Sequence, residues 1–486
     1  MLLVILYSLA ATYLAMYGLH ALLLVIQYGR HRHDQPRTIE LSEYPIVTVQ
    51  LPLYNEPNVV ERIIAAAANL DWPHDRLQIQ VLDDSIDHTT TLARSAVEAR
   101  RARGLDIEVI HRANRSGFKA GALANGLTIA TGEFVAIFDA DFVPAPDFLQ
   151  KMMPHFVSNS IGFVQARWDH LPTSSPFAKG LAIGVDGHFI VEQTARNRSD
   201  LPMIFNGSAG IWRTACIEAS GGWAGDTLCE DMDLSLRAAM AGWQCVFVPD
   251  VAVPQEEPEH ITHIKSQHGR WAKGGAQCLR KLSLPLLRSK LSVVQKAGGL
   301  MYLSGYAAHL MMLIVIVLWL PLALHPTLFK QMPLAFLGFG GLGLPIEYVA
   351  SQFALHGKGG FRKLLFLPVL MAVGFGLAFN NGLNVLEGLF KRSGEFKRTP
   401  KRGAGHAALT PDPRQTVQAF IELGLSLYTL ITAVLMAKSG EVISAGVLLI
   451  YSFGFALAGG GTLRLSLPRW LGIKPLQRVP HTPEQE

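Results

Sequence analysis

The stretch that decides the fold is Phe134-Val-Ala-Ile-Phe-Asp-Ala-Asp-Phe142, a short apolar run that ends in two carboxylates one residue apart. A strand that is buried on both faces of a sheet has such a continuous apolar sequence. Because side chains alternate along a strand, Asp139 and Asp141 are expected on the same face where the chain leaves the strand. Two neighbouring carboxylates repel each other unless a positive group lies between them. The pattern therefore indicates either a divalent cation bound to a substrate diphosphate or an ordinary turn that caps the next helix.

Predicted strands and helices alternate around this stretch. The predicted strands are 44–51, 77–82, 107–111 and 134–138, and the predicted helices are 59–70, 89–101 and 119–130. Such alternation is typical of a mostly parallel sheet, which binds ligands outside the carboxyl ends of its strands. Polar turns follow three of the strands, at Tyr54-Asn55-Glu56, at Asp83-Asp84 and at the Asp139/Asp141 pair. The sequence therefore predicts an α/β domain with one shared cleft.

Two loops rich in small residues add to this prediction. The loop 115–122 opens a helix, whose N-terminal amides favour an anion, and Lys119 could place a point charge on a phosphate. The alternative is an ordinary helix start with a solvated lysine. The loop 205–210, Phe-Asn-Gly-Ser-Ala-Gly, is either a place where a group approaches the backbone closely or a flexible turn.

Two further motifs lie later in the chain. Cys229-Glu230-Asp231 precedes a predicted helix at 234–241, where acidic side chains complement the helix dipole. The segment 267–271, Gln-His-Gly-Arg-Trp, ends the predicted domain. Its tryptophan is either an interfacial anchor or a platform for the apolar face of a sugar ring, and the spacing does not choose between these roles.

The composition indicates a membrane protein. Charged residues are 17% of the 486 residues and the mean hydropathy is +0.25, which is too apolar for an ordinary soluble protein. The net charge of +5 is better explained by lysine and arginine beside membrane spans than by a nucleic-acid surface. The cysteines show no Cys-x-x-Cys spacing, which favours reduced core thiols over disulfides or a zinc site.

Long uncharged runs flank the predicted domain. Residues 1–29 contain no Asp, Glu, Lys or Arg and predict a transmembrane helix, and the arginines that follow place the domain in the cytoplasm by the positive-inside rule. Basic residues among leucines at 279–296 predict an interfacial amphipathic helix. Further apolar runs lie at 297–329, 332–356, 364–386, 416–437 and 442–463.

The basic loop 391–415 conflicts with a simple count of these runs. Its first part, 391–402, holds six basic residues and one acid, so we expect it in the cytoplasm together with the tail 464–486. If all five later runs crossed the membrane, both segments would lie outside. We therefore expect five crossings in total and one irregular segment, which is either 332–356 or 364–386.

Taken together, the motifs resemble those of the processive membrane members of glycosyltransferase family 2, and especially the cellulose synthase-like proteins of the β-mannan or glucomannan synthase kind. The similarity runs from about Pro52 to Trp271 and returns at the basic loop near 396–401. It implies a GT-A-type nucleotide-sugar-binding domain over 40–278, joined to an α-helical transmembrane region at 297–390 and 416–463. One departure is Cys229, where many family members have threonine.

The resemblance also implies roles for single residues. The nucleoside would be held by Tyr54, Glu56 and Asp83 or Asp84, and Lys119 would lie beside the diphosphate. Asp139 and Asp141 would flank the metal–diphosphate, and Asp231 would be the general base. The acceptor and diphosphate end would be lined by Gln267, Arg270 and Trp271. The loop 205–210 resembles the acceptor-side loop of the family, and 396–401 resembles its gating loop.

The function implied by this resemblance is an inverting, metal-dependent transfer of a hexose from UDP-glucose or GDP-mannose, with Mg²⁺ or Mn²⁺, to a growing β-linked polysaccharide. We expect an integral protein of the bacterial inner (plasma) membrane that does not bind nucleic acid. The main alternative is transfer to a ceramide or diacylglycerol lipid. A transporter or receptor would need charged residues inside its spans, and these runs hold little besides Glu347 and Glu422.

Overall fold

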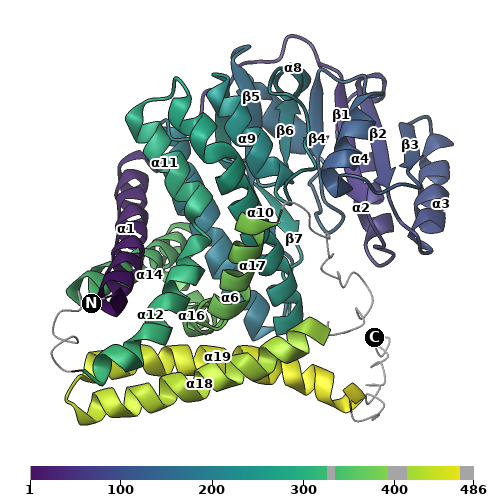
Figure 1. Ribbon diagram of the computed structural model, residues 1–486. Coiled ribbons are helices and arrows are strands. Elements are labelled where there is room, and N and C mark those ends of the chain that lie inside the picture. Colours follow the sequence, from purple (N-terminus) through teal and green to yellow (C-terminus); the bar gives the residue numbers. More distant parts are fainter. Residues whose placement is uncertain (1, 326–333, 392–412, 471–486) are drawn as a thin grey trace. The chain divides into compact units, whose positions relative to one another are not determined.

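The computed structural model describes residues 2–325, 334–391 and 413–470 (Figure 1). The expected gating loop at 396–401 and most of the tail lie outside the described residues. The chain divides into two compact units. One comprises Met1–Met371 with Ala378–Ala407, and the other comprises Ala372–Leu377 with Ala408–Glu486.

The first unit contains a mixed seven-stranded sheet, seen at the upper right of Figure 1. Its spatial order is β3 (Asp106–His111), β2 (Leu77–Asp83), β1 (Val47–Leu53), β4 (Phe134–Ile137), β6 (Gly210–Arg213), β5 (Ile161–His170) and β7 (Gln244–Gln255). The four strands β1 to β4 are parallel, as the sequence predicts. Strand β6 is antiparallel to both of its neighbours, and the sequence did not predict this half of the sheet.

Helices cover both faces of the sheet. Those of the domain are α2 (Val60–Ala68), α3 (Thr89–Arg101), α4 (Phe118–Leu127), α5 (Phe148–Met152), α6 (Pro176–Asp186), α7 (Thr194–Arg198), α8 (Thr214–Ala219) and α9 (Glu230–Met240), with 3₁₀ turns η1 (His74–Arg76) and η2 (Met153–His155) and a π-helix η3 (Gly187–Gln193). Strand β4 shows why its sequence is continuously apolar. Ala136 packs into the core on one face, whereas Val135 and Ile137 pack into the core on the other.

The interfacial helix predicted at 279–296 is not a separate element. Helix α10 is continuous from Ile261 to Arg288, so it contains both the segment 267–271 and most of the predicted helix. The next helix, α11 (Val293–Ser304), begins at a capping box in which Ser292 and Gln295 satisfy each other's backbone amides. Ser292 and the capping box therefore mark a helix boundary inside the segment that was predicted to be one helix.

The remaining helices of the first unit are long and apolar or sharply bent. They are α1 (Leu2–His31), α12 (Ala307–Ala323), α14 (Leu334–His356), η4 (Gly357–Gly359), α15 (Gly360–Leu364), α16 (Leu367–Gly376) and α17 (Ala378–Phe390), and the last residues of α16 fall in the second unit. Gly18 of α1 lies against the backbone of Gly340 and Gly343, and a side chain at any of the three would clash.

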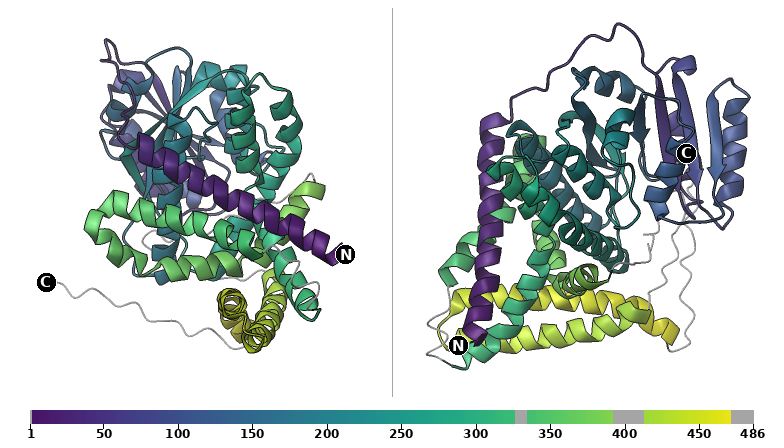
Figure 2. Two further views of the ribbon diagram at one scale, coloured as in Figure 1. Left: turned by 90° about the vertical axis from the view of Figure 1, so that its left-hand side faces the viewer. Right: turned by 45° about the horizontal axis from the view of Figure 1, so that its top comes forward.

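The second unit is built mainly from α18 (Pro413–Lys438) and α19 (Val442–Trp470), which lie side by side in Figures 1 and 2. Ser426 and Ser452 hydrogen-bond to each other across the pair. Gly376 approaches Gly454 within the same unit. Such small residues allow close helix packing without a large apolar side chain at the contact.

Within the described residues, three helices are long and apolar enough to cross a membrane: α1, α18 and α19 up to Ser466. Two bent pairs raise the number to five if each is one span: α11 with α12, bent by 63°, and Gly340–Leu364 with Leu367–Gly376, bent by 77°. The second pair includes parts of both 332–356 and 364–386, the two segments that the sequence offered as alternatives for the irregular element. The expected five crossings stay a prediction.

Candidate active site

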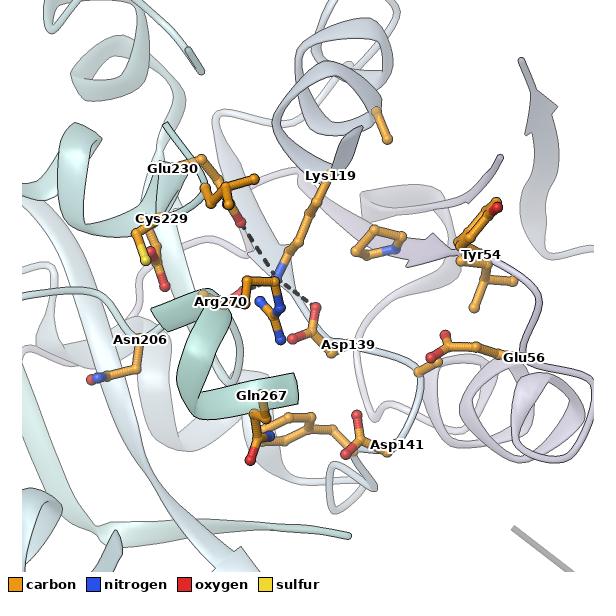
Figure 3. Close-up of a pocket in the computed structure, with 18 of the residues that line it drawn as sticks. Tyr54, Glu56, Lys119, Asp139, Asp141, Asn206, Cys229, Glu230, Gln267 and Arg270 are labelled. Carbon is orange, nitrogen blue, oxygen red and sulfur yellow. Dashed lines mark hydrogen bonds and ion pairs between the residues drawn. The ribbon is translucent and has the colours of Figure 1, made fainter. Parts of the chain in front are cut away.

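A pocket of ≈150 Å³ opens where β1, β2 and β4 end, and it is closed on the other side by α9 and α10. The sequence-predicted residues that line it are Tyr54, Glu56, Asp84, Lys119, Asp139, Asp141, Asp231, Gln267, Arg270 and Trp271. Figure 3 shows seven of these side chains around the pocket, from segments more than 200 residues apart in the chain: Tyr54, Glu56, Lys119, Asp139, Asp141, Gln267 and Arg270. The prediction of one shared cleft at the strand ends therefore agrees with the structure.

Asp83 is the predicted site residue that the structure places elsewhere. Its side chain is fully buried at the end of β2, where one carboxylate oxygen accepts from the amide of Ser85 at 3.0 Å. The other oxygen is 2.6 Å from the Thr90 hydroxyl and 2.9 Å from Nδ1 of His111. Asp83 therefore fixes the turn after β2, and only Asp84 reaches the pocket. Successive side chains along a strand point to opposite sides, so Asp83 binds the turn whereas its neighbour Asp84 faces the pocket.

Asp84, Tyr54 and Arg115 line one end of the pocket, and Arg112 holds Asp84 from behind. Arg112 makes a bidentate ion pair with Asp84, with Nε at 2.7 Å and Nη2 at 2.5 Å from the two carboxylate oxygens. The guanidinium of Arg115 stacks on Tyr54, 3.3 Å from the ring centroid. A flat aromatic ring with buried charge beside it suits the stacking and hydrogen bonding of a nucleobase.

Asp139, Asp141 and Lys119 lie at the centre. Nζ of Lys119 is 2.5 Å from Oδ1 of Asp139 and 3.8 Å from Oε1 of Glu230 (Figure 3). Burial lowers the pKa of Lys119, but the charges of Asp139, Glu230 and Asp231 outweigh it, so its pKa is raised and the ammonium stays charged. A fixed positive charge beside two carboxylates is the environment in which a diphosphate and its metal would be held.

The loop after η3 and α7 brings Gly207 against this cluster. Lys119 donates to the carbonyl of Gly207 at 2.8 Å, and the hydroxyl of Ser208 accepts from the amide of Asp139 at 3.0 Å. Gly207 has φ = +82°, and a Cβ there would lie 2.9 Å from Oδ2 of Asp231. Of the two interpretations of 205–210, the structure favours a close approach to the backbone, because the glycine lets the loop touch both Lys119 and Asp231.

Glu230 and Asp231 form the first turn of α9, which begins four residues earlier than predicted. Burial and the neighbouring Glu230 raise the pKa of Asp231 to about 7, against the opposing effect of Lys119. Burial also raises the pKa of Glu230. A carboxylate whose pKa is close to neutrality is suited to accept a proton from a hydroxyl.

Helix α10 supplies Gln267, Arg270 and Trp271 to the pocket, and glycines set its distance from α9. A Cβ at Gly274 would lie 2.4 Å from Sγ of Cys229, which is the residue before α9. The Cys229 side chain makes no capping hydrogen bond to the helix. The thiol therefore acts as a small packing group at the position where many family members have a hydroxyl, and the acids that follow it stay in place.

The donor set fits a metal that is shared with a substrate. Asp139 and Asp141 both line the pocket, whereas no group of three or more His, Cys, Asp or Glu side chains suited to hold a metal ion occurs in the described part of the chain. Mg²⁺ and similar hard cations are commonly bound by one or two carboxylates together with substrate phosphates. These residues suit such a metal–diphosphate, and they do not form a cage made by protein alone.

Several lining residues were not in the predicted set: Arg115, Trp168, Asn206, Glu230 and Gln255. Arg115, Asn206 and Glu230 belong to the loops 115–122 and 205–210 and to the motif 229–231. The sequence therefore indicated that these segments lie near the site, but not that these three side chains line the pocket. Trp168 and Gln255 come from β5 and β7. Nothing in the local sequence marks these two, because the mixed half of the sheet brings them to the pocket.

The fold and this site define a GT-A-like domain of the kind that binds nucleotide sugars. Residues 45–274 match the family model described as "Glycosyltransferase like family 2", so this part of the chain is a glycosyltransferase family 2 domain. A solved mannosyltransferase from Pyrobaculum calidifontis, in complex with GDP-Man and Mn²⁺, has the same fold, with a TM-score of 0.53 and 22% identity over 73% of this chain and 99% of that one.

Curated relatives extend the comparison. A probable glucomannan 4-beta-mannosyltransferase 7 of Oryza sativa subsp. japonica is 41% identical over 262 residues, which are 52% of this chain and 45% of that protein. Glucomannan 4-beta-mannosyltransferase 2 of Arabidopsis thaliana is 41% identical over 256 residues, 51% of this chain and 48% of that protein. The chain thus spans about half the length of these relatives.

Proposed function

We propose that the chain is an inverting, metal-dependent glycosyltransferase that extends a β-linked mannan or glucomannan from a nucleotide sugar, with GDP-mannose as the first candidate donor. The observation that carries the proposal is the placement of Asp231, with its raised pKa, against the Lys119–Asp139 cluster in one pocket. The names of the curated relatives favour mannose, and the domain that matches them contains this whole pocket.

The proposed reaction is a single displacement. The acceptor hydroxyl gives its proton to Asp231 as its oxygen forms a bond to the anomeric carbon of the donor. The bond from that carbon to the diphosphate breaks, and the electron pair leaves with the nucleoside diphosphate. Attack from the face opposite the leaving group inverts the carbon, so an α-linked donor gives a β-linkage. Asp231 is thus the one proton acceptor that the reaction requires.

The other pocket residues hold the two substrates. Lys119 and Arg270 would balance charge on the departing diphosphate, and Asp139 and Asp141 would hold the metal, which would supply further charge stabilisation when bound. Tyr54, Glu56 and Asp84 would contact the nucleoside. Trp271 and Gln267 would line the sugar-binding side. UDP-glucose is the second candidate donor, and the metal is Mg²⁺ or Mn²⁺.

Processive synthesis and the membrane arrangement belong to the same proposal. The long apolar helices support an integral membrane protein. We propose that the domain lies in the cytoplasm, because basic residues follow α1 and fill 391–402. The segment 396–401 would act as a gate over the pocket.

Radiolabelled donors test the proposal on the full chain in detergent. Wild-type protein should convert GDP-mannose into a product of many sugars, whereas Asp231→Asn should bind GDP as tightly as wild type and transfer no sugar. Asp147→Asn, an exposed change outside the pocket, is the matched control and should behave as wild type. Short products soluble in lipid solvents would contradict the polymer and support transfer to a lipid. Normal turnover by Asp231→Asn would contradict the assignment of the base.

A further inference from the structure

The wall of the pocket opposite the nucleoside end is formed by Asn206. Figure 3 shows Tyr54 and Glu56 on one side and Asn206 on the other, with Asp139 and Arg270 between them. Its neighbour Gly207 lies close to Asp231, the residue that would face the acceptor hydroxyl, since a Cβ on Gly207 would be 2.9 Å from Oδ2 of Asp231. On the proposed function, this wall is therefore where the acceptor would lie. The orientation of the Asn206 amide then decides which hydrogen-bonding groups the acceptor meets.

Two side chains fix that amide: Gln193, which is fully buried, and His188, whose side chain is 23% exposed. Gln193 donates to Oδ1 of Asn206 at 2.6 Å, which identifies this atom as the oxygen. Nδ2 of Asn206 is 2.9 Å from Nε2 of His188, so the imidazole nitrogen accepts this bond. His188 must then carry its proton on Nδ1, which is 2.8 Å from Oε2 of Glu192.

The chain of bonds continues away from the pocket. Glu192 accepts from Nε of Arg196 at 2.8 Å, and Arg196 is only 1% exposed. Burial raises the pKa of Glu192, but Arg196 and His188 outweigh it, so the pKa is held well below its usual range and Glu192 stays charged. Arg196 also donates to the carbonyl of Gly298 at 3.2 Å and lies 3.1 Å from Nε2 of His20. The network thus links α1 and α11 to the pocket wall.

The backbone beneath this network has an unusual form. His188 and Glu192 belong to the π-helix η3, whose wider turns are frequent at functional sites. Helix α14 packs closely on its first residue, since a Cβ at Gly187 would lie 2.7 Å from the ring of Tyr348. An ordinary helix would place the side chains that follow Gly187 at other angles. This π-helical segment lies between the pocket wall and α14.

We propose that His188 is a positioning residue for the acceptor: it fixes the amide of Asn206 on the pocket wall, and Glu192 and Arg196 hold His188 in turn. The proposal rests on the proposed function. It assigns to η3 and α1 a part in binding the acceptor, in addition to any role of α1 as an anchor.

The test compares two substitutions of His188 in the full chain. His188→Phe keeps the ring packing on Phe189 and Tyr302 but offers no acceptor to Asn206. Because one hydrogen bond to the wall is lost, the KM for β-1,4-linked mannohexaose should rise about tenfold, while the KM for hydrolysis of GDP-mannose in water stays within about twofold of wild type. His188→Gln, whose side-chain oxygen can accept the bond, should restore most of the acceptor KM. His155→Phe, at a buried histidine outside the network, is the matched control and should change neither constant.

The double variant His188→Phe/Asn206→Ala distinguishes an effect of His188 on Asn206 from a general loss of stability. If His188 acts through Asn206, His188→Phe should add less than about a twofold change to the acceptor KM of Asn206→Ala. Additive effects, or an equal loss in donor hydrolysis, would overturn the inference. If His188→Phe fails to fold, Asn206→Ala alone decides: a raised acceptor KM with normal donor hydrolysis supports the proposal, and an unchanged acceptor KM overturns it. A wild type that uses no nucleotide sugar would instead overturn the proposed function.

Discussion

Asp231 lies beside Glu230 in the first turn of α9, and its pKa is raised to about 7 by burial and by that neighbour. A base must be deprotonated to accept a proton, so kcat/KM should be low below pH 7, rise through about pH 7 and level off above it. Glu230→Gln removes a negative charge that raises this pKa, so the midpoint should move to lower pH. Initial rates of transfer from pH 5.5 to 8.5 would check both. A midpoint that moves to higher pH would contradict the coupling.

Substitution of Gly207 should show whether backbone strain alone, or also a contact with Asp231, limits the residue at this position. Alanine at φ = +82° costs about 1–2 kcal/mol in left-handed backbone, and its Cβ would also press on Oδ2 of Asp231 at 2.9 Å. Gly207→Ala should therefore lower both the melting temperature and kcat. Gly222→Ala is the control, because Gly222 has φ = +72° and nothing within 4 Å of a Cβ. It should lose similar stability and keep full activity, and equal losses of kcat in both variants would refute the contact.

Single site residues were predictable when a strand end or a motif marked them. Asp139 and Asp141 follow the apolar run 134–138, which predicts a buried strand. Asp231 belongs to the acidic motif 229–231 before a predicted helix. Asp83 and Asp84 were left as alternatives because a strand end cannot be located to one residue from its sequence, and of the two only Asp84 lines the pocket. Trp168 and Gln255 were missed because the pairing of β5, β6 and β7 is a long-range property of the sheet.

Among the elements, α10 carries more of the site than any other helix, and two adjacent glycines offer a test of how it is positioned. A Cβ at Gly274 would overlap Sγ and the backbone of Cys229, whereas a Cβ at Gly275 would be 3.7 Å from the ring of Tyr306. Gly274→Ala should push α10 away from α9, cost about 1–3 kcal/mol and lower kcat/KM up to about 100-fold through displaced Gln267 and Arg270.

Gly275→Ala is the matched control on the same helix. Alanine favours helical backbone over glycine by about 1 kcal/mol, so this variant should be as stable as wild type or slightly more stable, with unchanged activity. Melting temperature and kcat/KM measured for both variants would check the prediction. If Gly274→Ala were as active as its control, the close approach of α10 to Cys229 would not matter for the site.

The predicted and observed bounds of helices and strands agree in some places and differ in others. Helix α3 has the predicted bounds, and β2 differs by one residue, because hydrophobic period and turn residues agree there. The break between α10 and α11 was misplaced, because apolar and basic residues continue across it and only the Ser292 cap separates the helices. The π-helix was not foreseen, because the contacts around it, such as the close approach of Gly187 to Tyr348 of α14, join residues far apart in the sequence.

At the scale of the whole molecule, the glycosyltransferase domain packs directly on helices that follow it in the chain. Helix α10 is covered by α17: Lys273 pairs with Glu387 at 3.0 Å, and the side chain of Asn380 donates to the carbonyl of Lys265 at 3.0 Å. The backbone around Gly388 lies against the carbonyl of Lys273. The sequence predicted a domain that ends at 278, but that boundary falls inside α10. The domain therefore shares its last helix with the apolar region.

This sharing predicts how a truncated chain behaves. A fragment of residues 40–288 keeps the whole sheet and α10 but exposes the buried face of α10, including Ala272 and Ala276, which pack with Val385 of α17. Exposed apolar surface of this kind drives association, so the fragment should elute as aggregates in size-exclusion chromatography without detergent and bind GDP weakly. A fragment of residues 40–391, which retains α17, should bind GDP as the full chain does when purified in detergent. A monomeric 40–288 fragment with full affinity for GDP would show that α10 needs no cover and that the domain folds independently of the helices after it.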